Sequence, residues 1–565
     1  MTEGNNGIEA NPSARSKTGP YWVALLCLLC LLPFINKAFH IDDMVYFHPA
    51  QQIHENPFDP FGFKLITTWM YDISKNPPGH SYYLAGMALI FGWSEIAMHT
   101  SMLLASICAA LGIYQLARRF CEHPLLATAI SVLTPAFVVS NSNIMCEPLL
   151  LVIYVWALVL WIRGMDANDS RVLALAAIIL GFGILTKYIV ITAIPLLIAY
   201  SIARERRLST KLLFFVIPCL MLALYDLSTF LLYDRSSVLD VIRYSTKYST
   251  GQSGRFSLDG FVIGLTFLGG SYLSTLFFVP NLLKPRSIIR FAVLSLFVAG
   301  VMLVVGGFDT SYLMYDENAI RWSFVLQTSI FVSAGIVILA MTVLDVVRTR
   351  DADSLLLLLL VFGIFIFTIG VNWTINTRTL IPLLPAIGIL VVRRLEQTPQ
   401  NETLRFASPI PFALAALLTM SVAWGDYRHS ADMREAANRF AASKPSTEGQ
   451  IWFEGRSGYR FYMEQNGYSP LILDAFISKP AYEPVHLSDI GVNSGDMIVI
   501  YTSQKTLSIP AKNIASTSEV SISKSNFIST MNTQKGAGFY DAHQGPLPYY
   551  FGPAAGKSYT VYTIR

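Results

Sequence analysis

Residues 34–53 read FINKAFHIDDMVYFHPAQQI and place two adjacent carboxylates, Asp42 and Asp43, just past the apolar run 21–36. An ionisable group at membrane depth costs about 2.5–3.5 kcal/mol on insertion scales, so such groups usually have a functional or structural partner. The acidic pair therefore indicates chemistry at a membrane surface. The two residues also fit a helix N-cap followed by an acid in the first turn. Because neighbours at i and i+1 do not share a helix face, we expect the two carboxylates to have different roles.

The composition of the whole chain is that of a membrane protein. Of its 565 residues, 53% are hydrophobic and 14% are charged, against about 25% charged residues in soluble domains. Apolar stretches long enough to cross the roughly 30 Å hydrocarbon core recur along the chain. We predict an α-helical polytopic membrane protein with about 13 transmembrane helices in residues 20–425, preceded by a cytoplasmic N-terminal tail, residues 1–19. The net charge of +4 is small and is spread over short loops, which argues against nucleic-acid binding.

Loop charges predict the orientation of these helices. Lys and Arg residues recur in alternate loops, which by the positive-inside rule face the cytoplasm; they include Arg118, Arg119, Arg204, Arg393 and Arg394. The first external loop, 38–97, then lies outside, and its apolar stretch 77–91 is predicted to lie along the membrane interface because it is too short to span.

The C-terminal region, residues 430–565, is polar and contains strand-like segments such as GDMIVIYTS, residues 495–503. We predict a small α/β domain there. An odd number of spans places it outside the cytoplasm. The sequence thus predicts a multi-pass inner-membrane protein with its active site and C-terminal domain on the extracytoplasmic, periplasmic side.

Further charged residues are predicted at the outer ends of the spans, among them Lys75, Glu147, Lys187 and Arg378. Each has a simpler explanation: Lys187 and Arg378 fit snorkelling to the interface, and Glu147 fits a carboxylate favoured by a helix N-terminus. Taken together, they form the set that a transferase with a lipid-phosphate donor needs. A carboxylate takes the proton of the acceptor hydroxyl, and cations hold the departing phosphate.

Four histidines, His40, His48, His54 and His80, lie in the first external loop together with acids. A divalent metal would fit such a loop, but the spacing is not diagnostic of a metal site. We expect that no cofactor is required.

The order of several short motifs resembles that of the GT-C glycosyltransferases that use polyprenyl-phosphate sugars. This group includes the protein O-mannosyltransferases, the aminoarabinose–lipid A transferases and the rhizobial lipid A galacturonosyltransferase-like proteins (families 39 and 83). The matching motifs are the acidic pair Asp42-Asp43, Asn76-Pro77-Pro78, Glu147-Pro148-Leu149-Leu150, GFGILTKY at 181–188, and Arg378 with Pro382 and Pro385 in RTLIPLLP. Relatives often carry a basic residue or His where this chain has Asn76.

The resemblance implies an inverting transfer of one sugar from a polyprenyl-phosphate donor to a hydroxyl of a lipid, polysaccharide or protein acceptor at the outer face of the membrane. It implies that Asp42 is the catalytic base and that Asp43 belongs to the same catalytic pair. Substrate-binding roles fall to Lys75, Asn76, Glu147, Lys187 and Arg378. The implied partners are the donor, a membrane-associated acceptor and the lipid bilayer.

Three other classes remain open on the sequence, and one of them is a structural membrane protein whose external domain binds a partner. A multi-span lipid or sugar transporter or flippase would also hold charges within its spans, although no repeated pair of broken spans is evident. An oligosaccharyltransferase would be expected to carry a Trp-Trp-Asp motif, and this sequence contains no Trp-Trp.

Overall fold

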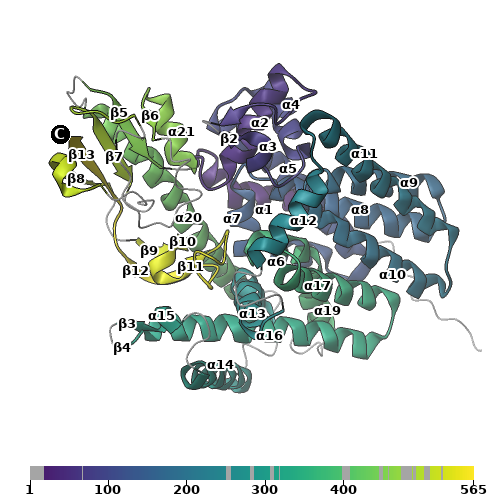
Figure 1. Ribbon diagram of the computed structural model, residues 1–565. Helices are drawn as coiled ribbons and strands as arrows, with labels where there is room; N and C mark the ends of the chain where they lie inside the picture. The colour runs from purple at the N-terminus through teal and green to yellow at the C-terminus, as the bar shows by residue number, and fades with distance from the viewer. Residues whose placement is uncertain are drawn as a thin grey trace, which may run out of the picture.

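The described part of the chain is mostly helical, with a strand-containing region toward the C-terminus (Figure 1). The computed structural model describes residues 18–65, 68–249, 256–279, 285–305, 311–316, 319–397, 408–443, 449–455, 457–471, 487, 491–501, 509–522 and 526–565. The predicted class, a polytopic helical membrane protein with a C-terminal α/β part, is confirmed.

The first half of the bundle contains α1 (Gly19–Leu31), η2 (Leu32–Phe34), α2 (Asp43–Glu55), α3 (Met70–Ile73), α4 (Gly79–Phe91), α5 (Glu95–Phe120), α6 (Pro124–Val132), α7 (Pro135–Asn141), α8 (Glu147–Ala167), α9 (Ser170–Ile184), η3 (Tyr188–Thr192), α10 (Ala193–Glu205), η4 (Thr210–Phe215), α11 (Val216–Tyr233) and α12 (Ser237–Ser249). The second half contains α13 (Leu258–Tyr272), η5 (Leu273–Phe278), α14 (Pro285–Val305), α15 (Ser311–Met314), α16 (Trp322–Thr349), α17 (Ala352–Gly370), α18 (Thr377–Leu380), η7 (Ile381–Leu383), α19 (Leu384–Glu396) and α20 (Ile410–Ala442).

Nine helices within the described residues are long and apolar enough to cross a membrane. They number ten if α6 and α7, which are bent by 64° at a short break, form one span. Two shorter apolar segments, Gly19–Phe34 and Ser170–Ile184, accompany them. The predicted number of about 13 spans stays a prediction.

The two ends of the bundle differ in charge. At one end, Arg119 pairs with Asp166 at 3.6 Å and with Asp353 at 3.3 Å, and Arg393 pairs with Asp345 at 3.3 Å. Helix α8 has 21 residues and runs from Glu147 to this end, a length of roughly 31 Å. The arginines of the predicted cytoplasmic loops therefore gather at the end of the bundle opposite Glu147.

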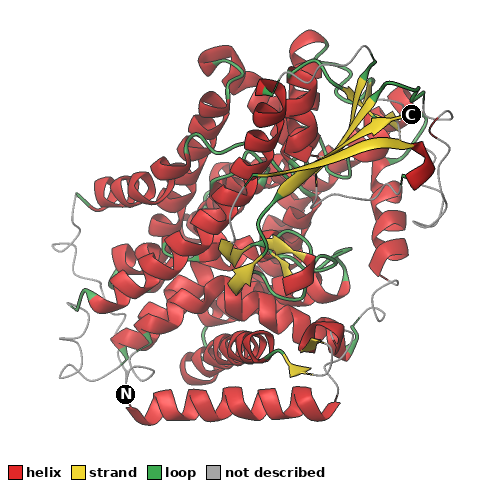
Figure 2. Ribbon diagram, turned by 90° about the vertical axis from the view of Figure 1, so that its left-hand side faces the viewer, coloured by secondary structure: helices red, strands yellow, loops and turns green. Residues whose placement is uncertain are grey.

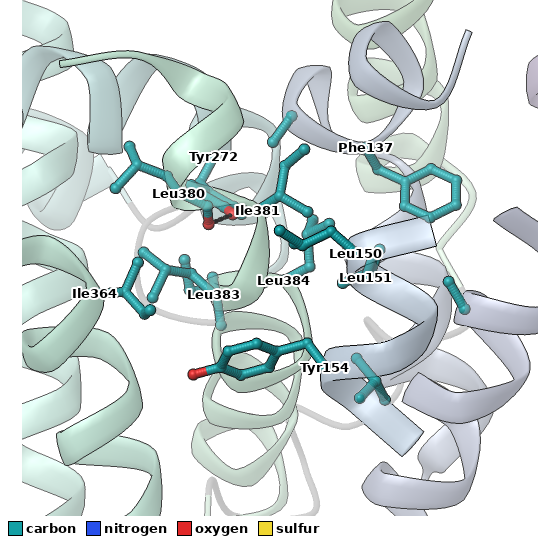
Figure 3. Packing of buried hydrophobic residues seen from close by; sticks show 14 of the residues in the cluster. Phe137, Leu150, Leu151, Tyr154, Tyr272, Ile364, Leu380, Ile381, Leu383 and Leu384 are labelled. Atoms are coloured by element: carbon teal, nitrogen blue, oxygen red, sulfur yellow. Dashed lines mark hydrogen bonds between the residues drawn. The ribbon is translucent and has the colours of Figure 1, made fainter. Parts of the chain in front are cut away.

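The segment α18–η7–α19 is buried in the centre of the bundle (Figure 3). Pro382 and Pro385 interrupt its regular helical hydrogen bonding, and the Leu380 carbonyl accepts a hydrogen bond from the Tyr272 hydroxyl at 2.6 Å. Figure 3 shows its apolar side chains among those of α8, α13 and α17, namely Leu380, Ile381, Leu383 and Leu384 beside Leu150, Leu151, Tyr154, Ile364 and Tyr272. This packing fixes the start of α18, where Arg378 lies.

The C-terminal region contains helix α21 (Ser457–Gln465) and a five-stranded sheet in the order β6-β5-β7-β13-β8. Strand β5 is parallel to β6 and β7, and β13 is antiparallel to β7 and β8. The strands are β5 (Ile451–Glu454), β6 (Ser469–Pro470), β7 (Met497–Tyr501), β8 (Ile514–Ser521) and β13 (Ser558–Ile564). The end of α20 and α21 pack on this sheet through Met433, Phe440, Tyr459 and Met463.

Four short strands between β8 and β13 belong to a different packing unit. They are β9 (Asn526–Ser529), β10 (Met531–Asn532), β11 (Ala537–Gly538) and β12 (Tyr550–Ala554). Buried side chains of this segment, such as Tyr540 and Leu547, join the same apolar cluster as the membrane helices, and Tyr549 donates to the Gly270 carbonyl of α13 at 2.9 Å. Figure 2 shows these strands between the large sheet and the helices. The predicted boundaries of the C-terminal domain, 430–565, stay a prediction.

The remaining strands form two two-residue hairpins in the bundle loops, β1 (Lys64–Leu65) with β2 (Thr68–Trp69) and β3 (Tyr315–Asp316) with β4 (Ala319–Ile320). The stretch 77–91 forms helix α4, whose last turn exposes Leu89 and Ile90. Its predicted place at the membrane interface stays a prediction.

Candidate active site

Asp42 lies immediately before helix α2, at the N-cap position, but its side chain caps no backbone amide of the helix. Its Oδ2 atom instead accepts a hydrogen bond from Arg378 Nη1 at 2.5 Å. The Asp42 side chain is 48% exposed, whereas that of Arg378 is 8% exposed. One carboxylate at the surface is thus held by a guanidinium group that comes from the buried centre of the bundle.

Glu147 begins helix α8 and contacts the other side of the same guanidinium group. Its Oε1 atom accepts hydrogen bonds from Arg378 Nε at 2.7 Å and from Lys187 Nζ at 2.6 Å. The Glu147 side chain is 1% exposed, so it depends on these two cations for compensation of its charge. Asp42, Glu147, Lys187 and Arg378, predicted from four distant parts of the sequence, are therefore brought together.

The Asn76-Pro77-Pro78 motif is held against this group by a close backbone contact. Gly79 donates from its amide to the Leu185 carbonyl at 2.9 Å, and a Cβ at Gly79 would lie 2.5 Å from that oxygen. The contact joins the start of α4 to the loop that carries Lys187. Asn76 Nδ2 donates to the Tyr46 hydroxyl at 3.1 Å, and this hydroxyl lies 3.2 Å from Cys146 Sγ, next to Glu147.

Lys75, the neighbour of Asn76, points to a different part of the protein. Its ammonium group donates to the Asp72 carbonyl at 2.5 Å and lies 5.3 Å from the centre of the Tyr244 ring, on α12. Burial, followed by the nearby Arg235 cation, lowers the pKa of Lys75. The structure places Lys75 beside α12, whereas Lys187 and Arg378 donate hydrogen bonds to Glu147. The predicted contact of Lys75 with the substrate stays a prediction.

The Asp43 side chain belongs to a second cluster of polar side chains, which is fully buried. Its Oδ2 atom accepts from the His40 amide at 2.8 Å and lies 3.3 Å from His40 Nδ1, while His40 Nε2 lies 3.4 Å from Asp426 Oδ2. Burial and Lys37 both act to lower the pKa of His40, but the carboxylates of Asp426 and Asp43 outweigh them and raise it. The two members of the acidic pair therefore have different surroundings, and the predicted catalytic role of Asp43 stays a prediction.

Lys37 and Asp426 were not among the residues predicted from the sequence. Lys37 Nζ lies 2.5 Å from Asp426 Oδ2, and both side chains are 0% exposed. Both residues stand at ends of apolar stretches, which is the same property that singled out Asp42. Tyr540, the third residue missed, lies in a short segment without a regular pattern.

The histidines of the first external loop lie in separate places. His40 belongs to the buried group with Asp426, His80 Nε2 lies 2.7 Å from the Ile144 carbonyl oxygen, and His54 packs on Trp93. Within the described residues, no group of three or more His, Cys, Asp or Glu side chains has a geometry that could hold a metal ion.

The fold and this site together define a multi-span membrane protein with an ion-paired, half-exposed carboxylate at the end of the bundle that carries the sheet. The chain has the GT-C fold. ArnT from Cupriavidus metallidurans with bound undecaprenyl phosphate superimposes with a TM-score of 0.51 at 14% identity, over 90% of this chain and 97% of that one. The apo oligosaccharyltransferase of Archaeoglobus fulgidus gives a TM-score of 0.47 at 12% identity, over 85% and 69% of the two chains.

At the sequence level, the family model described as dolichyl-phosphate-mannose-protein mannosyltransferase matches residues 75–233. This region contains Asn76, Glu147 and Lys187. No curated protein sequence matches the chain significantly.

Proposed function

We propose that this protein is an inverting glycosyltransferase that moves one sugar from a polyprenyl-phosphate donor to a hydroxyl group of an envelope glycolipid, polysaccharide or protein. The transfer takes place at the extracytoplasmic face of the membrane. The observation that carries the proposal is the contact of a single guanidinium group, that of Arg378, with the half-exposed Asp42 and the buried Glu147.

The charges of this group suit a lipid phosphate. Two cations, Arg378 and Lys187, face one buried carboxylate, that of Glu147. One positive charge is thus left for either Asp42 or an incoming anion. A guanidinium group can donate to two phosphate oxygens at once, and a cation fixed where negative charge accumulates stabilises the transition state.

Asp42 supplies the base in this mechanism. As the acceptor oxygen bonds to the anomeric carbon, its proton passes to the Asp42 carboxylate, and the bond from that carbon to the phosphate oxygen breaks. The electron pair leaves with the polyprenyl phosphate, a good leaving group, so that no general acid is needed. A positioned base contributes about 10²–10⁴-fold to such a rate.

The envelope glycolipids and glycoproteins of a deletion strain, compared with those of its parent by mass spectrometry, test the proposal. We expect one sugar to be missing from one class of molecule in the deletion strain. The gene for the wild-type protein should restore that sugar, while the gene for Asp42→Asn should not, at equal amounts of protein in the membrane. Unchanged glycosylation in the deletion strain, together with lost uptake or flipping of a metabolite, would favour the transporter instead.

A further inference from the structure

Behind the candidate active site lies a group of four ionisable side chains that the mechanism does not use. Lys37, His40, Asp43 and Asp426 are each 0% exposed. Lys37 pairs with Asp426 at 2.5 Å, and His40 lies between Asp426, at 3.4 Å, and Asp43, at 3.3 Å. Buried ion pairs add little stability relative to apolar residues of the same size, so stability alone is a weak explanation for this group.

Neutral partners complete the group and join four distant segments of the chain. Asp426 accepts hydrogen bonds from Tyr540 at 2.7 Å and from Thr530 at 2.6 Å. Asn143 contacts Lys37 at 2.5 Å and Tyr540 at 2.9 Å. Asn143 is four residues before Glu147, and Lys37 is five residues before Asp42, so short segments connect the group to both carboxylates that contact Arg378.

The backbone between these contacts is strained. Ile41 has φ of +49°, in the left-handed region that a β-branched residue rarely adopts. The residues on either side are both held: His40 contacts Asp426 and donates from its amide to Asp43 at 2.8 Å, and Asp42 accepts from Arg378 at 2.5 Å. Strained conformations of this kind persist only where the surroundings over-determine them, and they cluster at functional sites. Asp42 directly follows Ile41.

We propose that Asp426, on helix α20, is a positioning residue for sugar transfer: together with Lys37 it holds loop 37–43 in the strained conformation that presents Asp42 to Arg378. The inference rests on the proposed function, since Asp42 is the base there. In this arrangement Tyr540 ties the loop to the strand segment 526–554. The buried charges serve to select one loop conformation.

The first test compares the wild type with Asp426→Asn. Asparagine has nearly the same shape, and its one side-chain oxygen can still accept from Thr530, which donates to Oδ1 of Asp426. Its amide nitrogen in the place of Oδ2 cannot accept from Tyr540 or Lys37, so Lys37 is left without its counter-charge. We expect kcat to fall by at least about tenfold, while binding of undecaprenyl phosphate changes little, because Arg378 and Lys187 are untouched. A wild-type kcat in the folded variant would overturn the proposal.

The second test asks whether the loop conformation is the reason for the loss. Ile41→Gly removes the penalty for positive φ, whereas Ile41→Ala loses the same packing and keeps that penalty. In the Asp426→Asn background, Ile41→Gly should recover about 5- to 30-fold more kcat than Ile41→Ala, the ratio that corresponds to the usual cost of the left-handed conformation. Equal kcat in the two double variants would overturn the positioning role.

A third measurement does not depend on activity. Amide hydrogen exchange of residues 38–44 should be faster in Asp426→Asn than in the wild type, with exchange in α8 unchanged. If the wild type transfers no sugar, the proposed function fails, and the exchange result still decides whether Asp426 holds the loop. Should Asp426→Asn fail to fold, Tyr540→Phe removes one hydrogen bond from Asp426 and should show the same pattern of changes to a smaller extent. Unchanged exchange and kcat in Tyr540→Phe would then overturn the proposal.

Discussion

At the scale of single residues, Asp42 carries the first prediction. Asp42→Asn should lower kcat by about 10²-fold or more, because the amide cannot accept the proton of the acceptor hydroxyl. Since the Asp42 side chain is half-exposed, the variant should keep the stability of the wild type. Glu55→Gln removes an exposed acid from the other end of helix α2 and should leave kcat unchanged. Turnover of the purified variants in detergent or nanodiscs measures both, and near-normal turnover of Asp42→Asn would exclude Asp42 as the base.

Arg378 carries the second prediction at this scale. Arg378→Ala should abolish binding of undecaprenyl phosphate. Arg378→Lys should recover only part of this binding, because an ammonium group cannot form the bidentate hydrogen bonds that a guanidinium group forms with phosphate. Removing Arg378 leaves the buried Glu147 carboxylate with Lys187 as its remaining salt-bridge partner among the described residues. We expect the free energy of unfolding to fall by about 3–5 kcal/mol, the usual cost of breaking a buried ion pair.

A matched double variant separates stability from binding. Arg378→Ala combined with Glu147→Gln removes the buried carboxylate that has lost one of its two cations and leaves the partly exposed Lys187 without this partner. The double variant should therefore recover part of the thermal stability but not donor binding. If Arg378 only fixes the end of the segment at the interface, Lys will replace it fully and binding will be equal in the wild type and Arg378→Lys.

The third prediction at the residue scale concerns the pH dependence of stability. The pKa of His40 is raised in the folded protein, against burial and Lys37, by Asp426 and Asp43. This interaction stabilises the protein fully below about pH 6.5, the ordinary pKa of an unfolded histidine. It is lost as the pH rises through the higher folded-state pKa. The thermal midpoint of the wild type should therefore fall over this range more than that of His40→Gln; parallel curves would contradict the shift.

At the scale of elements, the sequence predicted what depends on local pattern. Apolar stretches such as those of α5 and α8 indicate spans because burial in lipid requires a continuous run of apolar residues. The ends of these runs also pointed to Glu147 and Arg378. The direction of Lys75 could not be predicted, since it depends on the distant Tyr244 of α12. The ion pair of Lys37 with Asp426 could not be predicted either, because the two residues are 389 positions apart in the sequence. The strands β9 to β12 are too short for a pattern, so their packing among the membrane helices was missed.

The contact of α21 with the loop before α2 gives a prediction at this scale. A Cβ at Gly458 would lie 1.7 Å from the Phe39 carbonyl oxygen and 3.2 Å from His40 Cα, so Gly458→Ala must displace either α21 or the loop that carries Asp42. We expect a loss of kcat of about tenfold or more, since small misplacements of a catalytic group are costly. Gly86→Ala in α4 is the control, because a Cβ there would have no neighbour within 4 Å among the described residues. A Gly458→Ala variant with normal kcat would mean that the loop does not depend on this contact.

At the scale of the whole molecule, the C-terminal region and the acidic pair must lie on the same side of the membrane. Gly458 and Tyr462 of α21 contact the backbone of Phe39, and Tyr540 lies 3.3 Å from His40. The arginine pairs of Arg119 and Arg393 lie at the opposite end of the helices. The side on which the C-terminus lies therefore also assigns the side of Asp42.

By the positive-inside rule the arginine-bearing end faces the cytoplasm, so we predict that the C-terminus lies outside it. An alkaline phosphatase fused after Arg565 folds only where disulfides form and should be active, whereas a green fluorescent protein that fluoresces only in the cytoplasm should be dark at the same place. Fusions after Arg119 should give the reverse pattern, which controls for expression and insertion. A stable but inactive phosphatase fusion after Arg565 would place Asp42 in the cytoplasm, and the acceptor would then have to be a cytoplasmic hydroxyl.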